Sequence, residues 1–171
     1  MMHIAIDPGQ TGGIAWSVSG EVRAGGMPDS LTGQVQILTD LARGLVQEAG
    51  KVQCCIERVG GYVPGNAGPA AVTFARHCGN IEAIVATLRI PMVPPLGVTP
   101  QTWMASMSMP RHDPIDKAMP MAERKKLLAQ RKAERKRAIR DLMQRQYPHL
   151  KVTLETADAL GILTWAMKVV A

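Results

Sequence analysis

The sequence is poor in aromatic residues and cysteine, and it lacks long hydrophobic runs. Its 171 residues include one Phe, two Tyr and three Trp, so aliphatic side chains and eleven Met must build the core. No stretch approaches the roughly 18 consecutive apolar residues that a membrane-spanning helix needs. The N-terminus also has no basic leader. We therefore expect a soluble, unsecreted protein with no membrane partner.

The few cysteines lack the spacing of a metal or redox site. Cys54 and Cys55 are adjacent in an apolar strand pattern, Cys78 lies in a helical pattern, and no Cys-x-x-Cys occurs. We interpret all three as reduced core thiols. The histidines are scattered and form no motif with a Ser or Cys nucleophile, which disfavours covalent catalysis.

Positive charge is concentrated in one segment of the chain. Residues 121–147 hold ten Lys or Arg against three acids, a balance of +7, whereas the whole chain carries +6. The remainder is therefore slightly acidic, at −1. This asymmetry indicates a polyanionic partner, with a solvated helix face as the alternative. The segment lacks Gly and Pro up to residue 146, which predicts a helix of about 26 residues and roughly 39 Å.

The order of apolar patterns predicts one α/β domain over residues 1–171. HIAID, GGIAWSVSG and EVRAGGMP read as three antiparallel strands, followed by a helix over 31–49 that Asp29 or Ser30 can cap. VQCCIE and IPMVPP add parallel strands on either side of a helix over 70–88. The expected sheet is mixed and five-stranded, and helices flank it. We also expect a short helix over 99–107, a basic helical insertion at about 108–147 that is a candidate for mobility, and a last helix starting near Thr153 or Thr156.

Four carboxylates fall where this order of elements would bring them together. Asp7 ends the first strand and Glu57 ends the fourth, while Glu155 and Asp158 start the last helix on one face. Acids at the ends of apolar strands are costly to bury without a cation or partner, and Mg²⁺ prefers oxygen ligands. We expect these four side chains to form a catalytic metal site.

Each carboxylate also has an ordinary structural interpretation. Asp7 in Asp-Pro-Gly is a common turn residue, and Glu57 could pair with Arg58. Glu155 and Asp158 could simply favour the positive N-terminal end of a helix. The set is therefore a stronger indication than any of its members.

The motifs MHIAIDPGQTGGIAW, QCCIERV, AVTFARHCGNIEAIVATLRIPMVPPLGVTPQTW and LETADALGILTWA resemble RuvC-type Holliday junction resolvases, especially the phage and chloroplast branches. The resemblance covers most of the chain and is most specific at Ile-Asp-Pro-Gly and Glu-x-x-Asp-Ala-Leu. It implies an RNase H-like fold in which the four matching carboxylates bind two Mg²⁺ ions, with Mn²⁺ as a substitute, and no organic cofactor.

The resemblance further implies an endonuclease that nicks four-way DNA junctions symmetrically as a homodimer. The helix over 70–88 would then be a candidate dimer interface, with ordinary packing against its own sheet as an equal alternative. It also implies a cytoplasmic protein of a bacterial or phage-infected cell, with an organellar one as the alternative. The chain departs from the family between Trp103 and Tyr147, where the proline-rich stretch and basic helix look extended.

Candidate DNA contacts come from three places. The basic segment would bind phosphates and lose affinity steeply with salt, and a long loop beside the acids holds an aromatic residue that could stack on a base. Arg58, Arg76 and His77 could also touch phosphate, and all of these side chains could instead be solvated or locally paired. The predicted DNA-binding residues are Arg58, Tyr62, Arg76, Lys125, Lys126, Arg131, Lys132, Arg135 and Lys136.

Three rival functions follow from the same residues. Asp7, Gly9 and Thr11 also resemble the first phosphate loop of actin-like ATPases and sugar kinases, but those need two such domains and the chain is too short. A branched-DNA nuclease of the same fold could cut flaps or forks. A non-catalytic DNA-binding module would rely on the basic helix alone. Metal-dependent cleavage separates the last of these from the nucleases.

Overall fold

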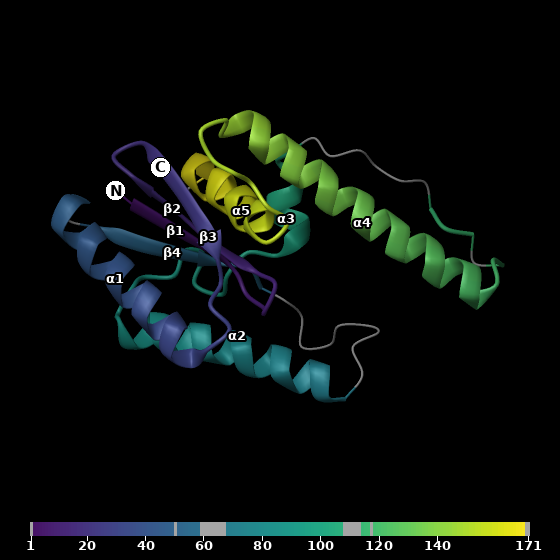
Figure 1. Cartoon of the computed structure of the whole chain (residues 1–171), viewed down its shortest axis with the longest axis horizontal. Helices are drawn as coiled ribbons and strands as arrows, with labels where there is room; N and C mark the ends of the chain where they lie inside the picture. The colour runs from purple at the N-terminus through teal and green to yellow at the C-terminus, as the bar shows by residue number, and fades with distance from the viewer. Residues whose placement is uncertain (1, 50, 59–67, 108–113, 117, 170–171) are drawn as a thin grey trace.

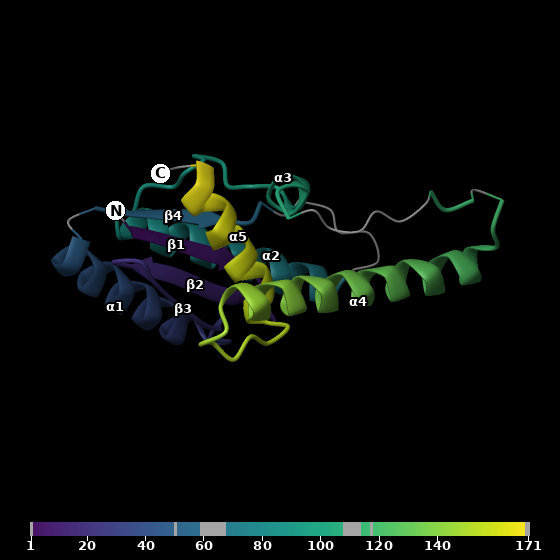
Figure 2. The same cartoon turned by 90° about the horizontal axis from the view of Figure 1, so that it is seen from above.

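A four-stranded sheet forms the centre of the structure and has helices on both faces (Figures 1 and 2). The structure is a computed structural model and describes residues 2–49, 51–58, 68–107, 114–116 and 118–169. Strand order across the sheet is β3-β2-β1-β4. β1 and β3 are antiparallel to β2, and β4 is parallel to β1. The strands are β1 Met2–Asp7, β2 Gly13–Val18, β3 Glu21–Gly26 and β4 Val52–Ile56.

The described residues form five helices around this sheet. α1 and α2 lie on one side of it, whereas α3 and α5 lie on the other, and α4 extends outward from α5 (Figures 1 and 2). As predicted, α1 begins beside Ser30, whose Oγ accepts a hydrogen bond from the Gly33 backbone N–H at 3.1 Å. Of the described helices, none is long and apolar enough to cross a membrane. The helices are α1 Leu31–Ala49, α2 Pro69–Thr87, α3 Pro100–Ala105, α4 Met121–Gln146 and α5 Thr156–Val169.

Alternation along the strands divides the core into two layers. Met2, Ile4 and Ile6 of β1 pack into the layer on the α1 and α2 side. Ala5 of β1 and Cys55 of β4 face the other layer, which α5 fills. Because successive strand residues point to opposite faces, a residue that follows Ala5 or Cys55 by two positions also lies on the α5 side.

The prediction of a fifth strand is wrong. The segment over residues 90–98 runs beside β4 but meets it only at two isolated parallel bridges, Cys54 with Met92 and Glu57 with Val98. Three prolines, Pro91, Pro94 and Pro95, lack the N–H that a continuous ladder requires, so pairing cannot extend through them. The sheet therefore has four strands, and the prolines leave only point contacts at its β4 edge.

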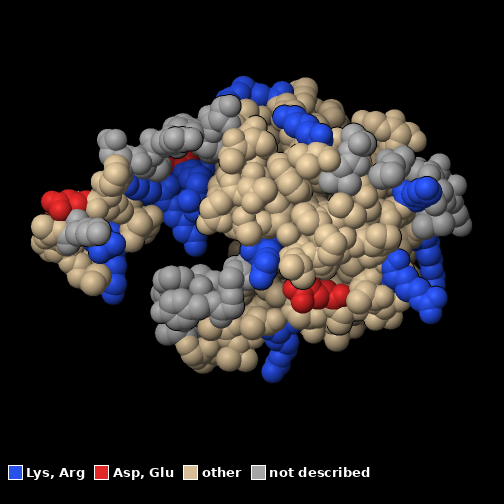
Figure 3. Space-filling view, turned by 180° about the vertical axis from the view of Figure 1, so that it is seen from behind, with Lys and Arg blue, Asp and Glu red and all other residues tan. Residues whose placement is uncertain are grey.

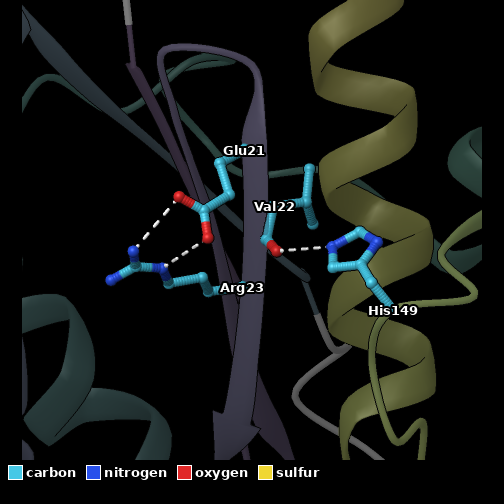
Figure 4. Close-up of polar contacts among 4 residues, drawn as sticks. All are labelled: Glu21, Val22, Arg23 and His149. Atoms are coloured by element: carbon cyan, nitrogen blue, oxygen red, sulfur yellow. Dashed lines mark hydrogen bonds and ion pairs between the residues drawn. The ribbon is translucent and has the colours of Figure 1, made fainter.

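The other edge of the sheet, β3, is partly covered by a histidine. His149, from the turn after α4, donates through Nε2 to the backbone oxygen of Val22 at 3.2 Å (Figure 4). Glu21 and Arg23 form an exposed ion pair at 3.1 Å on the same strand (Figure 4). A charged pair and a capped carbonyl are common ways to discourage edge-to-edge pairing. His149 thus has a structural partner in the backbone of β3.

All three cysteines are free, which agrees with their interpretation as thiols. Cys54 and Cys55 are buried, and burial raises the pKa of the Cys55 thiol to about 12. Cys78 is only half-buried. Thiols whose pKa is raised by burial stay protonated and unreactive at neutral pH.

Candidate active site

Asp7 and Glu57 lie side by side at one end of the sheet. β1 and β4 are parallel with Ile6 opposite Ile56, and the Glu57 backbone N–H donates to the Ile6 oxygen at 2.8 Å. The next residues in register are Asp7 and Glu57. Asp7 follows Ala5 by two positions, and Glu57 follows Cys55 by two positions. Because Ala5 and Cys55 face the α5 side of the sheet, both carboxylates also point toward α5. The predicted convergence of the two strand ends is therefore present.

Asp158 joins this pair from the first turn of α5. Asp7, Glu57 and Asp158 line one cavity of about 420 Å³ between the sheet, α3, α4 and α5. One oxygen of Asp158, Oδ1, is buried and has no hydrogen-bond partner. An unpartnered buried carboxylate oxygen is unfavourable unless a cation or donor from outside completes it.

Burial dominates the electrostatics of the three acids. Asp7 is 9% exposed, and desolvation together with the charges of Glu57 and Asp158 raises its pKa to about 8. Desolvation also raises the pKa of Glu57 and of Asp158. Without an added cation the site holds too much negative charge for its burial, which is typical of carboxylates that bind metal.

Glu155 does not join the other three acids. α5 begins at Thr156, so Glu155 precedes the helix, and its side chain is exposed. A Cβ placed on Gly26 at the end of β3 would lie 3.0 Å from Glu155 Oε2, which puts the carboxylate beside that strand. Glu155 is not among the residues that line the acidic cavity. Glu155 lies in the capped turn that leads into α5, because the Thr156 N–H donates to Thr153 Oγ1 and the Ala157 N–H donates to the Thr153 oxygen at 3.1 Å. Its carboxylate lies beside the end of β3 rather than in the acidic cavity.

Trp103 is a residue of the site that the sequence argument missed. It lies in α3, is 1% exposed, and donates from its indole Nε1 to Glu57 Oε1 at 2.8 Å. The two residues are 46 positions apart in the sequence, so no local spacing connects them. The sequence shows Trp103 in a short helix that Thr99 and Pro100 begin, but it gives no sign that Glu57 is its hydrogen-bond partner.

A second missed contact ties the Asp7 loop to α2. The Gly9 backbone N–H donates to His77 Nδ1 at 3.1 Å, and His77 is 5% exposed. Gly9 has a φ of +136°, a conformation that L side chains rarely adopt. Sequence reasoning offered His77 as a phosphate contact, whereas the structure gives its Nδ1 to the backbone.

The basic helix forms the opposite wall of the acidic cavity. Lys132, Arg135 and Lys136 line it, and Lys136 Nζ lies 3.9 Å from Asp158 Oδ2. Lys136 also lowers the pKa of Asp7 and Glu57 against the larger effect of their burial. In the space-filling view from behind, Lys and Arg side chains lie on the arm that projects from the body and also at several places over the rest of this face (Figure 3). Cations and buried acids thus share one cleft.

The remaining predicted DNA contacts are spread more widely. Arg58 is exposed next to Glu57, and its backbone N–H donates to the Val98 oxygen at 2.7 Å. Arg76 is exposed on α2, and Lys125 and Lys126 are exposed toward the start of α4. Arg131, also on α4, is half-buried. Tyr62 lies outside the described residues.

The acids fit magnesium better than a metal held by the protein alone. Among the described residues, no three His, Cys, Asp or Glu side chains are placed to hold one metal ion together. Mg²⁺ commonly binds through one or two carboxylates and completes its shell with water and substrate phosphate. The unpartnered Asp158 oxygen and the raised pKa values of the three acids are the features such an ion would relieve.

Comparison with known proteins assigns the fold. No family model matches the chain, and no curated protein matches its sequence. Among solved structures, this mixed α/β arrangement is similar to RuvC of Thermus thermophilus, with a TM-score of 0.51 and 14% identity over 98% of this chain and 96% of that one. The same protein in complex with a Holliday junction substrate gives a TM-score of 0.51 and 12% identity over 98% and 95%. The resemblance to RuvC is thereby confirmed at the level of the fold.

Proposed function

We propose that this protein is a magnesium-dependent endonuclease that cuts four-way DNA junctions. The observation that carries the proposal is one cleft with buried acids on one wall and lysines on the other. Asp7, Glu57 and Asp158 supply the acids, and Lys132 and Lys136 face them from α4. Because a DNA strand is a chain of phosphates, the lysine wall would attract it and the acid wall would need cations to admit it.

One or two of these three carboxylates would bind each metal ion, with water and substrate phosphate completing its ligands. Besides burial, Glu57 and Asp158 raise the pKa of Asp7, and Asp158 raises that of Glu57, so the three acids form one group whose charge bound cations would offset. Bound Mg²⁺ supplies activation of water and stabilisation of the leaving oxygen in phosphodiester hydrolysis. The role of the chain is to hold these oxygens at the ends of β1, β4 and the start of α5, with Lys136 beside them.

Charge on α4 is divided between two faces. Lys125, Lys132 and Ile139 are spaced by seven residues and so share one face, and Ile139 is buried against the core. Lys136 and Met143 follow the same spacing and lie beside that face, with Met143 also buried. Lys125, Lys132 and Lys136 therefore lie on the same face of α4 as Ile139 and Met143, the two residues that pack into the core.

The acids of α4 lie on the far side of the helix. Glu134 and Asp141 are seven residues apart, and Glu123 is three turns before Glu134, which puts all three on the opposite face. Asp141 pairs with Arg140 at 2.7 Å, and Glu134 accepts from Gln130 at 2.8 Å. We infer that DNA lies along the lysine face, so Lys125, Lys132 and Lys136 contact it and Lys126 contributes less.

A cleavage assay on synthetic DNA tests the proposal. In Mg²⁺, wild-type protein should nick a four-way junction in both of two opposed strands, and Asp7→Asn should bind the same junction without cutting it. Mn²⁺ should replace Mg²⁺. A wild-type protein that binds the junction and never cuts it with either metal would instead be a DNA-binding module, and the nuclease proposal would be wrong.

The substrate can be narrowed in the same assay. When junction, flap, fork and linear duplex are supplied in equal amounts, the four-way junction should be cut fastest. Faster cleavage of flaps or forks would keep the nuclease and change its substrate to other branched DNA. Symmetric cutting of two strands requires two active sites, so sedimentation of the protein on a junction should show a homodimer.

A further inference from the structure

We infer that Trp103 is a positioning residue that fixes the orientation of the Glu57 carboxylate for metal binding. The inference rests on the proposed nuclease function, because positioning matters only if Glu57 is a metal ligand. The contact is a 2.8 Å hydrogen bond from the indole Nε1–H to Glu57 Oε1. A hydrogen bond to a charged acceptor is stronger than one between neutral groups.

The indole N–H of Trp103 has Glu57 as its hydrogen-bond acceptor. Trp103 is 1% exposed, so little of the indole is open to bulk solvent. Indole N–H is a donor only, and a buried donor that loses its acceptor keeps the full cost of desolvation. Trp103 therefore holds Glu57 Oε1, and the same carboxylate lies within hydrogen-bonding reach of Asp7. The indole thus fixes one oxygen of a carboxylate that faces the other acids of the site.

Packing around the indole also holds it in place. α3 begins at Pro100, and Thr99 Oγ1 caps it by accepting from the Thr102 N–H at 3.3 Å. On the opposite side, a Cβ added to Gly161 of α5 would lie 2.7 Å from Trp103 Cζ3. α5 therefore carries a glycine where the ring needs the space. The same helix supplies Asp158, so one element sets both the ring and an acid of the site.

A positioning role differs from ordinary core packing in what it affects. A Trp that only fills space would change stability when shortened, and metal-dependent cleavage would fall only through unfolding. A Trp that orients a metal ligand would change cleavage while junction binding by the lysine face stays the same. Supporting partners of metal ligands typically contribute 10- to 100-fold to activity or metal affinity, so about that loss is expected.

The chain offers a matched control for the substitution. Trp165 of α5 belongs to the same hydrophobic layer as Trp103 and is 8% exposed, but it does not line the acidic cavity. Trp103→Phe and Trp165→Phe remove the same atoms from the same core. Only the first removes the donor to Glu57.

The first test follows cleavage and binding together in full-length protein. Trp103→Phe should cut a four-way junction in Mg²⁺ roughly 10- to 100-fold more slowly than wild type, with unchanged junction affinity. Trp165→Phe should cut at the wild-type rate. Equal losses in both variants, or an unchanged rate in Trp103→Phe, would overturn the inference.

The second test needs neither metal nor activity. The three indole N–H signals of ¹⁵N-labelled protein are assigned by their loss in Trp-to-Phe variants, or from wild-type spectra if a variant fails to fold. In Glu57→Gln the Trp103 signal should move upfield, because a neutral amide is a weaker acceptor, and the Trp165 signal should stay. A Trp103 signal that does not move would overturn the inference. If wild type never cuts DNA but the signal moves, the nuclease proposal fails and the hydrogen bond stands.

Discussion

The acidic end of the sheet and helix α4 carry opposite charge and are built in opposite ways. The acids Asp7, Glu57 and Asp158 sit largely inside the protein, and their pKa values are raised by that burial. Of the 26 residues of α4, only Ile139 and Met143 are buried, and the lysines remain mostly in water. Burial fixes the acids in place, whereas exposure leaves the lysines adaptable. The first region is suited to chemistry and the second to affinity.

The sharpest test of this contrast compares Asp158→Asn with Glu155→Gln. Asp158 lines the acidic cavity, so its variant should lose about 1,000-fold in cleavage rate, equivalent to about 4 kcal/mol in the barrier. Glu155 is exposed beside Gly26, so its variant should lose far less. Single-turnover cleavage of a junction measures both. Equal losses would restore Glu155 as a fourth ligand, in line with the sequence prediction.

A smaller effect is expected from the basic helix, and it should appear in binding. Lys125→Gln with Lys132→Gln removes two positive charges from the lysine face, and Lys126→Gln with Arg137→Gln removes two from the side of the helix. The first pair should weaken junction binding about 10-fold and lower the salt slope by about 2, since each phosphate contact contributes close to one. The second pair should do less. If both pairs of substitutions weaken junction binding equally, α4 attracts DNA by its net charge and not through one particular face.

Overpacking between Gly161 and the Trp103 ring should lower the stability of the fold. Gly161→Ala puts a methyl group against the Trp103 ring, which should destabilise the fold by about 1 to 3 kcal/mol. Thermal unfolding measures this loss, with Gly79→Ala on α2 as control because a Cβ there meets nothing within 4 Å. An unchanged melting temperature would mean that the ring has room to move, contrary to the packing described above.

A further prediction concerns the pH dependence of metal-free stability. The pKa of Asp7 is raised to about 8 from 3.8, so between these values the folded protein holds a proton that the unfolded chain has released. Stability from this group is complete below pH 4 and declines as the pH rises toward 8. Melting temperatures in EDTA should therefore fall more steeply from pH 5 to pH 8 in wild type than in Asp7→Asn. Parallel curves for the two proteins would exclude this contribution.

Sequence alone located the strand-end acids and the basic helix, because both follow from short-range patterns. Asp7 and Glu57 each end an apolar run, and α4 follows from 26 residues without Gly or Pro. The register between β1 and β4 then brings the acids together, which parallel pairing of the two strands made foreseeable.

Errors arose where the outcome depended on one backbone group or one distant side chain. Prolines within residues 90–98 removed the fifth strand by withholding N–H groups, although the apolar pattern was suitable. Glu155 lies beside Gly26 and outside the acidic cavity, which its spacing to Asp158 did not reveal. Trp103 could not be paired with Glu57, since their contact depends on the path of 46 intervening residues.

Among the described residues, α4 packs against the rest of the molecule through its C-terminal half. Its buried residues lie near its C-terminal end, and the opposite end projects away from the sheet (Figures 1 and 2). The 18 residues from Ile139 back to Met121 span roughly 27 Å, so a tilt of about 10° at the root displaces the tip by about 5 Å. If the protein binds branched DNA as proposed, such a tilt would let the lysines of α4 follow DNA arms at different angles while the buried acids keep their positions.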